Sequence, residues 1–209
     1  MTALWIVLAI IVAIALAIVA SYNRFVRQRN LVQESWRQVD VELNRRHDLI
    51  PNLVETVKGY ATQERTVLQS VTEARTAAVQ TLQAQSAGVD QQAQAENNLG
   101  RALNGLFAVA ENYPDLKSSQ NFLALQQQLA ETEDRIAAAR RFYNGNVRAL
   151  NTRVEAFPSS IIASTFNFSK ADYFEVDDPV VRAPVAVDFS SLSPTSTPTS
   201  PPQTGQTPS

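Results

Sequence analysis

The feature that most constrains this chain is an uninterrupted apolar run from residue 3 to residue 20. The run contains no charged residue, and the indole edge of Trp5 is its one polar group. As a helix it spans roughly 27 Å, which matches the hydrocarbon thickness of a bilayer. A helix also satisfies its own backbone groups in lipid. The sequence therefore predicts a membrane span, within an anchor of residues 1–22, that consists of Ala3, Leu4, Trp5, Ile6, Val7, Leu8, Ala9, Ile10, Ile11, Val12, Ala13, Ile14, Ala15, Leu16, Ala17, Ile18, Val19 and Ala20.

Two other interpretations of this run are open. A buried core helix would seldom be terminal and bare of polar residues. A cleaved signal peptide is the stronger alternative, because Ala15-Leu16-Ala17 resembles a cleavage site. Against it, no basic residue precedes the run, and the run exceeds the usual apolar region of about 7–15 residues. Trp5 and Tyr22 lie near the two ends, where aromatic rings favour the headgroup region.

The flanks of the span predict its orientation. Arg24, Arg27, Arg29 and Arg37 follow the span, whereas only the α-amino group precedes it. An excess of basic residues marks the cytoplasmic side. We therefore expect a single pass through the plasma (inner) membrane, with the N-terminus outside and the helical domain in the cytoplasm. A Ser/Thr/Pro-rich tail favours the alternative, a domain on the outer face.

Charge and cysteine usage exclude several classes of function. Eighteen basic and twenty acidic residues give a net charge of −2, so there is no electrostatic case for binding nucleic acid. The absence of cysteine excludes disulfides, thiolate metal ligands and a cysteine nucleophile. A single histidine, His47, gives a weak basis for a metal site or a catalytic triad. We expect no catalytic residue, no metal and no cofactor.

Apolar residues at three- and four-residue spacing predict an all-α domain over residues 23–158. Two architectures fit. In the favoured one, Asp48 caps a new helix, and four helices of about 26, 36, 24 and 39 residues form an antiparallel up-down bundle. In the alternative, three long helices include one that kinks at Pro51. That first rod would reach roughly 90 Å, so the last helix would overrun its neighbour and expose its apolar seam.

Some positions test this pattern. Arg46 falls on the apolar stripe of the continuous helix, a costly placement unless it is paired. Glu64 interrupts the apolar series of the next helix. Asp90 is expected to cap the third helix, and Ser118 or Ser119 to open the last one, which Pro158 closes.

Two further segments follow the predicted bundle. Residues 159–189 are apolar and aromatic, and we expect them to pack on the bundle end or on the membrane. Residues 190–209 lack the apolar surface that would offset the entropy of ordering, so we expect a disordered tail.

Candidate binding residues are few. His47 is expected to be a solvated turn residue, and the run Glu131, Glu133, Asp134 and Arg135 an exposed charged face. Small residues at four-residue spacing in the span form a candidate self-association face, Ala9, Ala13 and Ala17. Polar residues on one side of the last helix form a candidate interaction face, Arg140, Arg141, Asn144, Arg148 and Asn151.

Three stretches resemble the LemA family: RNLVQESWRQVDVELNRRHDLIPNLVETVKGYATQE, NFLALQQQLAETEDRIAAARRFYNGNVRALNTRVEAFPSSIIA and FEVDDP. The resemblance implies a single-pass bacterial membrane protein with a helical-bundle domain and a short external N-terminus. It supplies no substrate, cofactor or catalytic residue. His47 stands where many members have tyrosine, and Gln63 where histidine is common.

These observations together predict a non-enzymatic, membrane-anchored scaffold or protein-interaction module, with the lipid bilayer, other proteins and a second copy of the chain as expected partners. The alternative is an accessory or regulatory subunit of a membrane or envelope enzyme such as a protease.

Overall fold

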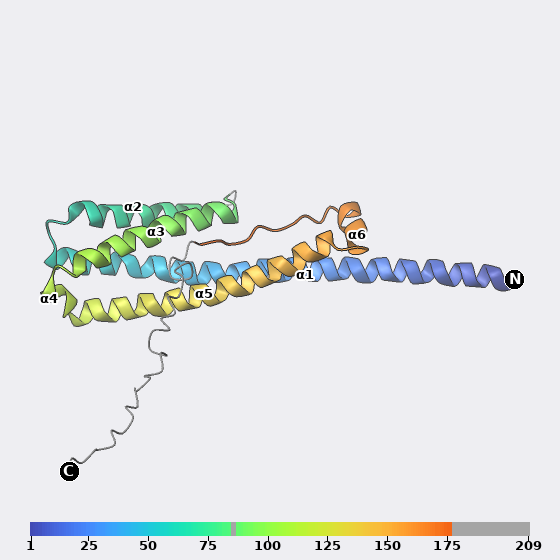
Figure 1. The fold of residues 1–209 in the computed structure, drawn as a ribbon, viewed down its shortest axis with the longest axis horizontal. Helices are drawn as coiled ribbons and strands as arrows, with labels where there is room; N and C mark the ends of the chain where they lie inside the picture. The colour runs from blue at the N-terminus through green and yellow to red at the C-terminus, as the bar shows by residue number, and fades with distance from the viewer. Residues whose placement is uncertain (85–86, 177–209) are drawn as a thin grey trace, which may run out of the picture. The chain divides into compact units, whose positions relative to one another are not determined.

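The computed structural model describes residues 1–84 and 87–176 (Figure 1). Within these ranges all regular structure is helical, and no strand is present. This confirms the all-α class. The residues 177–189 of the predicted extension and the predicted tail lie outside the described residues. The helices are α1 (Thr2–Tyr60), α2 (Arg65–Gln83), α3 (Val89–Ala110), α4 (Pro114–Lys117), α5 (Gln120–Glu155) and α6 (Ser159–Thr165).

Helix α1 is a single helix of 59 residues that joins the apolar run to the helical body. Its most apolar window has a mean hydropathy of 3.1, and none of that window is buried. It is the one helix in the described part of the chain that is long and apolar enough to cross a membrane. This N-terminal apolar stretch indicates membrane anchoring. From Phe25 onwards the same helix buries side chains at regular spacing, as far as Val57.

The predicted helix boundary at Asp48 is wrong. Helix α1 continues through Pro51, and the chain turns at residues 61–64. The alternative of three long helices is also wrong, because α2 starts separately at Arg65. A helix that continued past Tyr60 would place the carboxylate of Glu64 on its buried stripe, which is costly. The turn instead leaves Glu64 half-buried before α2, where the Tyr113 hydroxyl donates a hydrogen bond to it at 3.4 Å.

A contact from α2 explains how α1 passes through Pro51. Proline has no N–H, so the carbonyl of His47, four residues earlier, loses its helical partner. The Nε of Arg75 in α2 donates a hydrogen bond to that carbonyl oxygen at 2.8 Å. A buried backbone acceptor needs such a partner. The side chain of Arg75 therefore replaces the missing hydrogen bond and ties α2 to α1.

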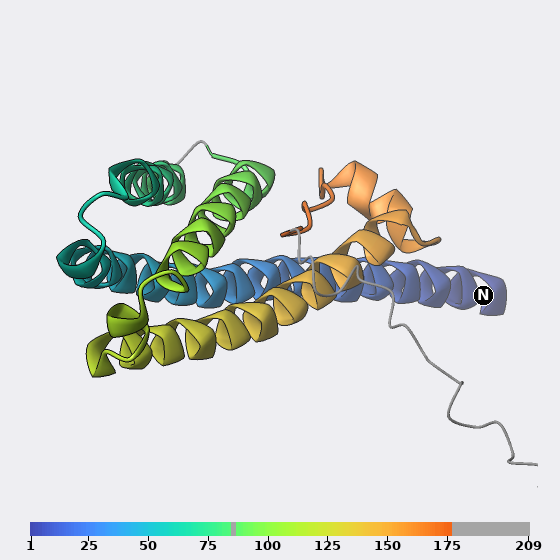
Figure 2. The ribbon, with the colours of Figure 1, turned by 60° about the vertical axis from the view of Figure 1, so that its left-hand side comes forward.

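The long helices pack in pairs. Helix α5 runs antiparallel along α1, and α2 packs on both α3 and α1 (Figures 1 and 2). The return of the last helix toward the apolar end agrees with the predicted order. The up-down four-helix bundle is not confirmed in detail. A closed bundle would also pack α3 along α5, whereas the close pairs are α1–α5, α2–α3 and α1–α2.

Two hydrophobic clusters fill the space between these helices. The distal cluster lies where α2, α3 and α4 cover α1 and α5, and includes Leu53, Val71 and Leu106. The proximal cluster lies nearer the apolar stretch, and includes Phe25 and Phe174. There α6 and the residues after it cover the α1–α5 pair (Figure 2), joined by a few apolar side chains from the facing ends of α2 and α3.

The residues after α5 pack on the proximal half. Asn167 has a φ of 55°, a conformation that asparagine tolerates, and after it the chain runs without regular structure to Val176. We call residues 167–176 the extended segment. Phe174 in this segment is fully buried and contacts Trp36 with ring centroids 5.4 Å apart.

The predicted helix starts are partly confirmed. Ser119 immediately precedes α5, as expected. The prediction that Asp90 caps α3 is wrong, because the cap residue is Gly88 and Asp90 lies in the first turn. A carboxylate in the first turn still interacts favourably with the helix dipole.

Candidate functional site

A buried polar layer separates the two hydrophobic clusters. It consists of five side chains from three helices: Arg46, His47, Gln92, Glu96 and Glu133. On α1 the layer falls between Leu43 of the proximal cluster and Ile50 of the distal one. It is the one place where α1, α3 and α5 are joined by side-chain ion pairs within the described residues.

Glu96 is the centre of the polar layer, and its side chain is 1% exposed. Arg46 donates to it and also donates to Glu133 at 2.7 Å. The Nε2 of His47 lies 3.0 Å from Glu96 Oε1, and the amide of Gln92 donates to the same oxygen at 2.5 Å. Because a carboxylate only accepts hydrogen bonds, His47 carries a proton on Nε2.

The charges in the layer shift one another's pKa values. Burial by itself would raise the pKa of Glu96, but the hydrogen bond from His47 and the charge of Arg46 outweigh it, so the pKa lies below its ordinary value. Burial by itself would lower the pKa of Arg46, but Glu96 and Glu133 raise it. Both groups are therefore held in their charged forms.

This arrangement joins three helices through buried side chains. Both carboxylate oxygens of Glu96 face donors of the same chain, and the residue is closed to solvent. A buried pair of this kind fixes which helix positions meet, because any sliding of one helix would leave a charge unpaired. We interpret the polar layer as a register lock between α1, α3 and α5.

The layer corrects two expectations. His47 is not a solvated turn residue: it lies inside α1 and is 1% exposed. Glu133 does not belong only to an exposed face, since its half-exposed carboxylate pairs with Arg46. Arg46 itself behaves as its position required, since it is buried and paired. The sequence could have indicated the layer through an arginine and a glutamate, Arg46 and Glu96, each on an otherwise apolar stripe.

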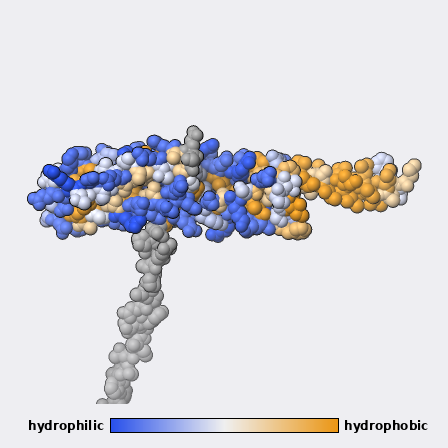
Figure 3. Space-filling model, turned by 90° about the horizontal axis from the view of Figure 1, so that it is seen from above, coloured by the Kyte–Doolittle hydropathy of each residue, from blue (hydrophilic) through white to orange (hydrophobic). Residues whose placement is uncertain are grey.

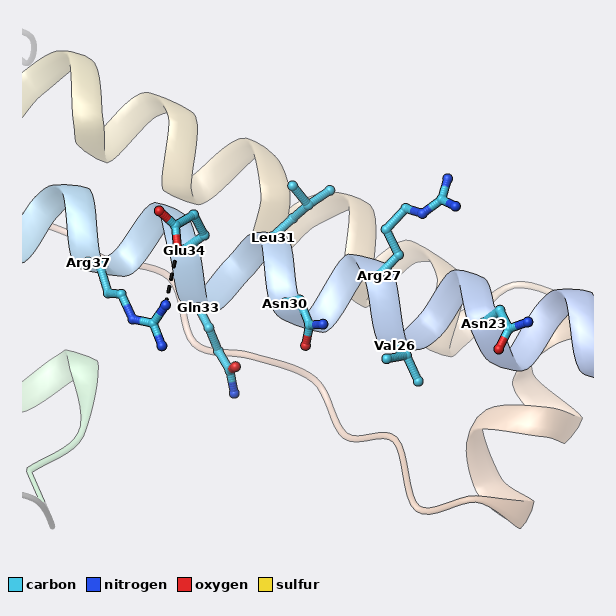
Figure 4. Close-up of a pocket in the computed structure, with 8 residues that line it drawn as sticks. All are labelled: Asn23, Val26, Arg27, Asn30, Leu31, Gln33, Glu34 and Arg37. Atoms are coloured by element: carbon cyan, nitrogen blue, oxygen red, sulfur yellow. Dashed lines mark hydrogen bonds and ion pairs between the residues drawn. The ribbon is translucent and has the colours of Figure 1, made fainter.

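Two adjoining hollows form an open groove along the proximal part of α1, and Figure 4 shows the larger one. They have volumes of about 690 and 440 Å³ and share Gln33 and Arg37. Figure 4 shows Val26, Asn30 and Gln33 pointing from α1 toward the side of the extended segment. The larger hollow is lined by Asn23, Val26, Arg27, Asn30, Leu31, Gln33, Glu34 and Arg37. These side chains are mostly polar and amide-rich, which suits hydrogen bonding to another protein.

The predicted interaction face on α5 divides into two parts. Arg141 and Arg148 are exposed. The others bind the extended segment of the same chain. Asn144 accepts from the Phe174 N–H at 2.9 Å and donates to the Phe174 carbonyl at 3.1 Å.

Asn151, about two helical turns further along α5, repeats this pattern. It accepts from the Ala171 N–H and donates to the Ala171 carbonyl, both at 2.9 Å. Tyr143 donates to the Asp172 carbonyl at 2.8 Å, and Arg140 to the Val176 carbonyl at 3.1 Å. Side chains of α5 therefore supply the backbone hydrogen bonds that the extended segment lacks. The sequence signal was two asparagines seven residues apart inside a helix.

The predicted self-association face remains open to solvent or lipid. Ala9, Ala13 and Ala17 are exposed, like the rest of the apolar stretch. Their role in self-association stays a prediction.

The fold and these sites define a class of protein: an all-helical body that is continuous with an apolar N-terminal helix and is held in register by a buried ionic layer. The chain belongs to the LemA family, whose family model matches residues 35–189. This confirms the resemblance identified from the sequence.

Curated relatives carry two names. Magnetosome protein MamQ 2 of Paramagnetospirillum magneticum is 26% identical over 186 residues, which cover 79% of this chain and 68% of the relative. Magnetosome protein MamQ of Magnetospirillum gryphiswaldense is 24% identical over 208 residues, covering 88% and 76%. Protein LemA of Metamycoplasma hominis is 26% identical over 170 residues, covering 81% and 74%.

Proposed function

We propose that this protein is a membrane-anchored, non-enzymatic scaffold that presents a rigid helical body to protein partners. One observation carries the proposal: the helix that forms the apolar stretch is the same helix that runs through both hydrophobic clusters. A protein whose task is to hold a partner at a fixed place beside a membrane benefits from such a connection. A flexible linker would give up that fixed position.

The location of the groove supports a partner that also lies at the membrane. Its lining begins at Asn23, three residues after the apolar run ends, and extends to Arg37. At 1.5 Å per residue this places the groove within roughly 25 Å of the bilayer. A membrane protein could reach it directly. The same location favours the second candidate, an accessory or regulatory subunit of a membrane enzyme such as a protease.

The orientation belongs to the proposal as well. Arg24, Arg27 and Arg29 follow the span at once and are exposed, which supports a cytoplasmic body and an external N-terminus. Because the chain has no cysteine, a single Ser70→Cys variant reports this cleanly. Protection from an impermeant thiol reagent until lysis is the expected result; labelling in intact cells would place the body on the outer face.

The scaffold proposal is tested by photo-crosslinking from the groove in living cells. A benzophenone amino acid replaces Asn30 or, in separate strains, Gln33. The matched control replaces Glu55, an exposed residue of the same helix at the distal end. A discrete adduct from the groove and none from Glu55 is the expected result.

The mass of the adduct distinguishes the candidates. An adduct of twice the chain mass indicates a second copy, which the Ala9, Ala13 and Ala17 face would then explain. An adduct with an enzyme subunit favours the accessory role. The same weak adduct pattern from all three positions would contradict the proposal, because the groove would then bind nothing specific.

A further inference from the structure

The proximal end of the body carries exposed apolar side chains beside the point where α1 leaves the apolar run. Phe157 is 82% exposed, Ile161 56% and Phe166 47%. They lie between α5 and α6, in α6 and just after α6, respectively. We call these three residues the collar. In Figure 3 the hydrophobic surface of the body gathers at this end, next to the apolar rod.

The height of the collar along α1 is set by direct ring contacts. Phe166 meets Tyr22 edge-to-face, with ring centroids 5.1 Å apart, and Phe168 meets Tyr22 at 5.6 Å. Tyr22 comes two residues after the last residue of the apolar run, Ala20. Two residues of helix correspond to roughly 3 Å, so the collar lies at the level where the hydrocarbon core ends and the headgroups begin.

Basic side chains accompany the collar. Arg24, Arg27 and Arg29 are exposed on α1 at this level, and the guanidinium of Arg29 lies 5.8 Å from the centre of the Phe168 ring. Residues 21–30 and 151–170 together contain five basic residues and one acidic residue, Glu155. Apolar rings combined with guanidinium groups match the two chemistries of this layer, acyl chains and lipid phosphates.

We propose that the collar inserts into the headgroup–acyl boundary of the bilayer that α1 spans, and so gives the body a second, interfacial membrane contact. The bilayer is the expected binding surface because the collar is packed on the same helix that forms the span. The same helix that carries the apolar run places the collar at the bilayer surface, where exposed phenylalanine and isoleucine side chains are removed from water. Folding α6 back onto Tyr22 thus brings a C-terminal part of the chain to the membrane.

The inference rests on the membrane anchoring in the proposed function, and its test uses the full chain. The protein is reconstituted in vesicles of phosphatidylcholine and phosphatidylglycerol, with or without bromine on the acyl chains. A fluorophore is attached at Thr165→Cys, an exposed α6 position next to the collar. The control is Ser118→Cys, exposed at the distal end between α4 and α5.

Bromine on the acyl chains should quench the fluorophore at Thr165→Cys and so lower its fluorescence clearly. The fluorescence of the label at Ser118→Cys should not change. Adding Phe157→Ser and Ile161→Ser should remove that loss. The matched pair Leu123→Ser and Phe142→Ser, 48% and 52% exposed in the wild type, should leave the loss in place. The helix signal in circular dichroism verifies that each variant folds.

Other results overturn the inference. If the fluorophore at Thr165→Cys is not quenched while the protein resists extraction at high pH, the collar does not touch lipid although the anchor holds. Energy transfer between labels on two copies, without quenching, assigns the collar to a second copy instead. If quenching persists in the Phe157→Ser and Ile161→Ser variant, the label is near the bilayer only because α6 lies beside the span, and the collar side chains do not insert. If the protein is released from the vesicles at high pH, it is not anchored by a span, and both the membrane anchoring and the lipid contact of the collar are wrong.

Discussion

The distal and proximal halves of the body cover the same pair of helices in two different ways. In the distal half, α2 and α3 lie over α1 and α5 and contribute mainly apolar side chains. In the proximal half, α6 and the extended segment lie over them, held by hydrogen bonds from α5 side chains as well as by aromatic contacts. The polar layer lies at the boundary.

The difference follows from where each cover finds its backbone hydrogen bonds. A helix satisfies its own backbone, so it can pack through apolar contacts alone. An extended chain that leaves water must obtain each hydrogen bond from a neighbour. The asparagines of α5 serve that need, and they explain why a polar stripe runs along a helix face that is largely covered.

The largest expected effect comes from breaking the layer between the two halves. Arg46→Met leaves the buried carboxylate of Glu96 without its main counter-charge, and should lower the free energy of unfolding by about 3–5 kcal/mol. Arg45→Met is the matched control, because Arg45 pairs with Glu42 near the surface and should change stability by less than about 0.5 kcal/mol. Urea unfolding of the full chain in micelles measures both. Equal effects would show that the layer locks nothing.

A smaller effect is expected from freeing the cover of the proximal half. Asn144→Leu removes the partners of the Phe174 N–H and carbonyl, which are only partly buried, and should lower the free energy of unfolding by about 1–3 kcal/mol in total. Hydrogen exchange should speed up at the amides of Ala171 and Phe174 and remain unchanged in α2 and α3. Arg148→Leu, an exposed change on the same helix, provides the control. Uniform acceleration across both halves would mean that they unfold as one unit.

The distal half has its own backbone contact to test. Arg75→Met removes the donor to the His47 carbonyl and should cost about 1–3 kcal/mol. In a Pro51→Ala background residue 51 regains its N–H, so the same change should cost clearly less. The double-mutant cycle therefore measures the coupling between Arg75 and Pro51. Strictly additive costs would contradict the assigned role of Arg75.

The smallest effect is expected from the titration of one carboxyl in the polar layer. The pKa of Glu96 lies below its ordinary value of 4.5, so the charged form stabilises the fold at every pH above that value. This contribution is lost as the pH falls below 4.5 and through the folded-state pKa. Glu96→Gln should therefore weaken the loss of stability in that acid range, whereas Glu55→Gln, on the exposed distal surface, should leave it unchanged. Unfolding curves collected at a series of acid pH values measure this.

Periodicity was sufficient for the class and for much of the element list. The last helix, predicted to open at Ser118 or Ser119 and to close at Pro158, matches α5 almost to its ends, because apolar residues at three- and four-residue spacing over that length fit only a helix. The family resemblance was carried by specific stretches and was confirmed. The apolar run predicted the N-terminal stretch of α1 for the same reason, length without polarity.

Three of the errors share one physical cause, a contact with a residue that is distant in the sequence. The local sequence around Asp48 and Pro51 predicts a helix start. Nothing near them in the sequence shows that Arg75 supplies the hydrogen bond that the His47 carbonyl loses to the proline. His47 read as a solvated residue because its partner, Glu96, is 49 residues away. The pairing of Asn144 with Phe174 spans 30 residues and was equally hidden. Local propensity describes what a segment prefers, and tertiary contacts decide what it adopts.

The unbroken course of α1 has a mechanical consequence. From Ala20 to Tyr60 the helix is a shaft of roughly 60 Å beyond the bilayer. A membrane helix commonly tilts by about 20°, and a tilt of that size would swing the far end of the shaft sideways by roughly 20 Å. A change in bilayer thickness or tension that alters the tilt of the anchor would then displace the α2–α3 end sideways. The short anchor and the long shaft would move like the two arms of a lever.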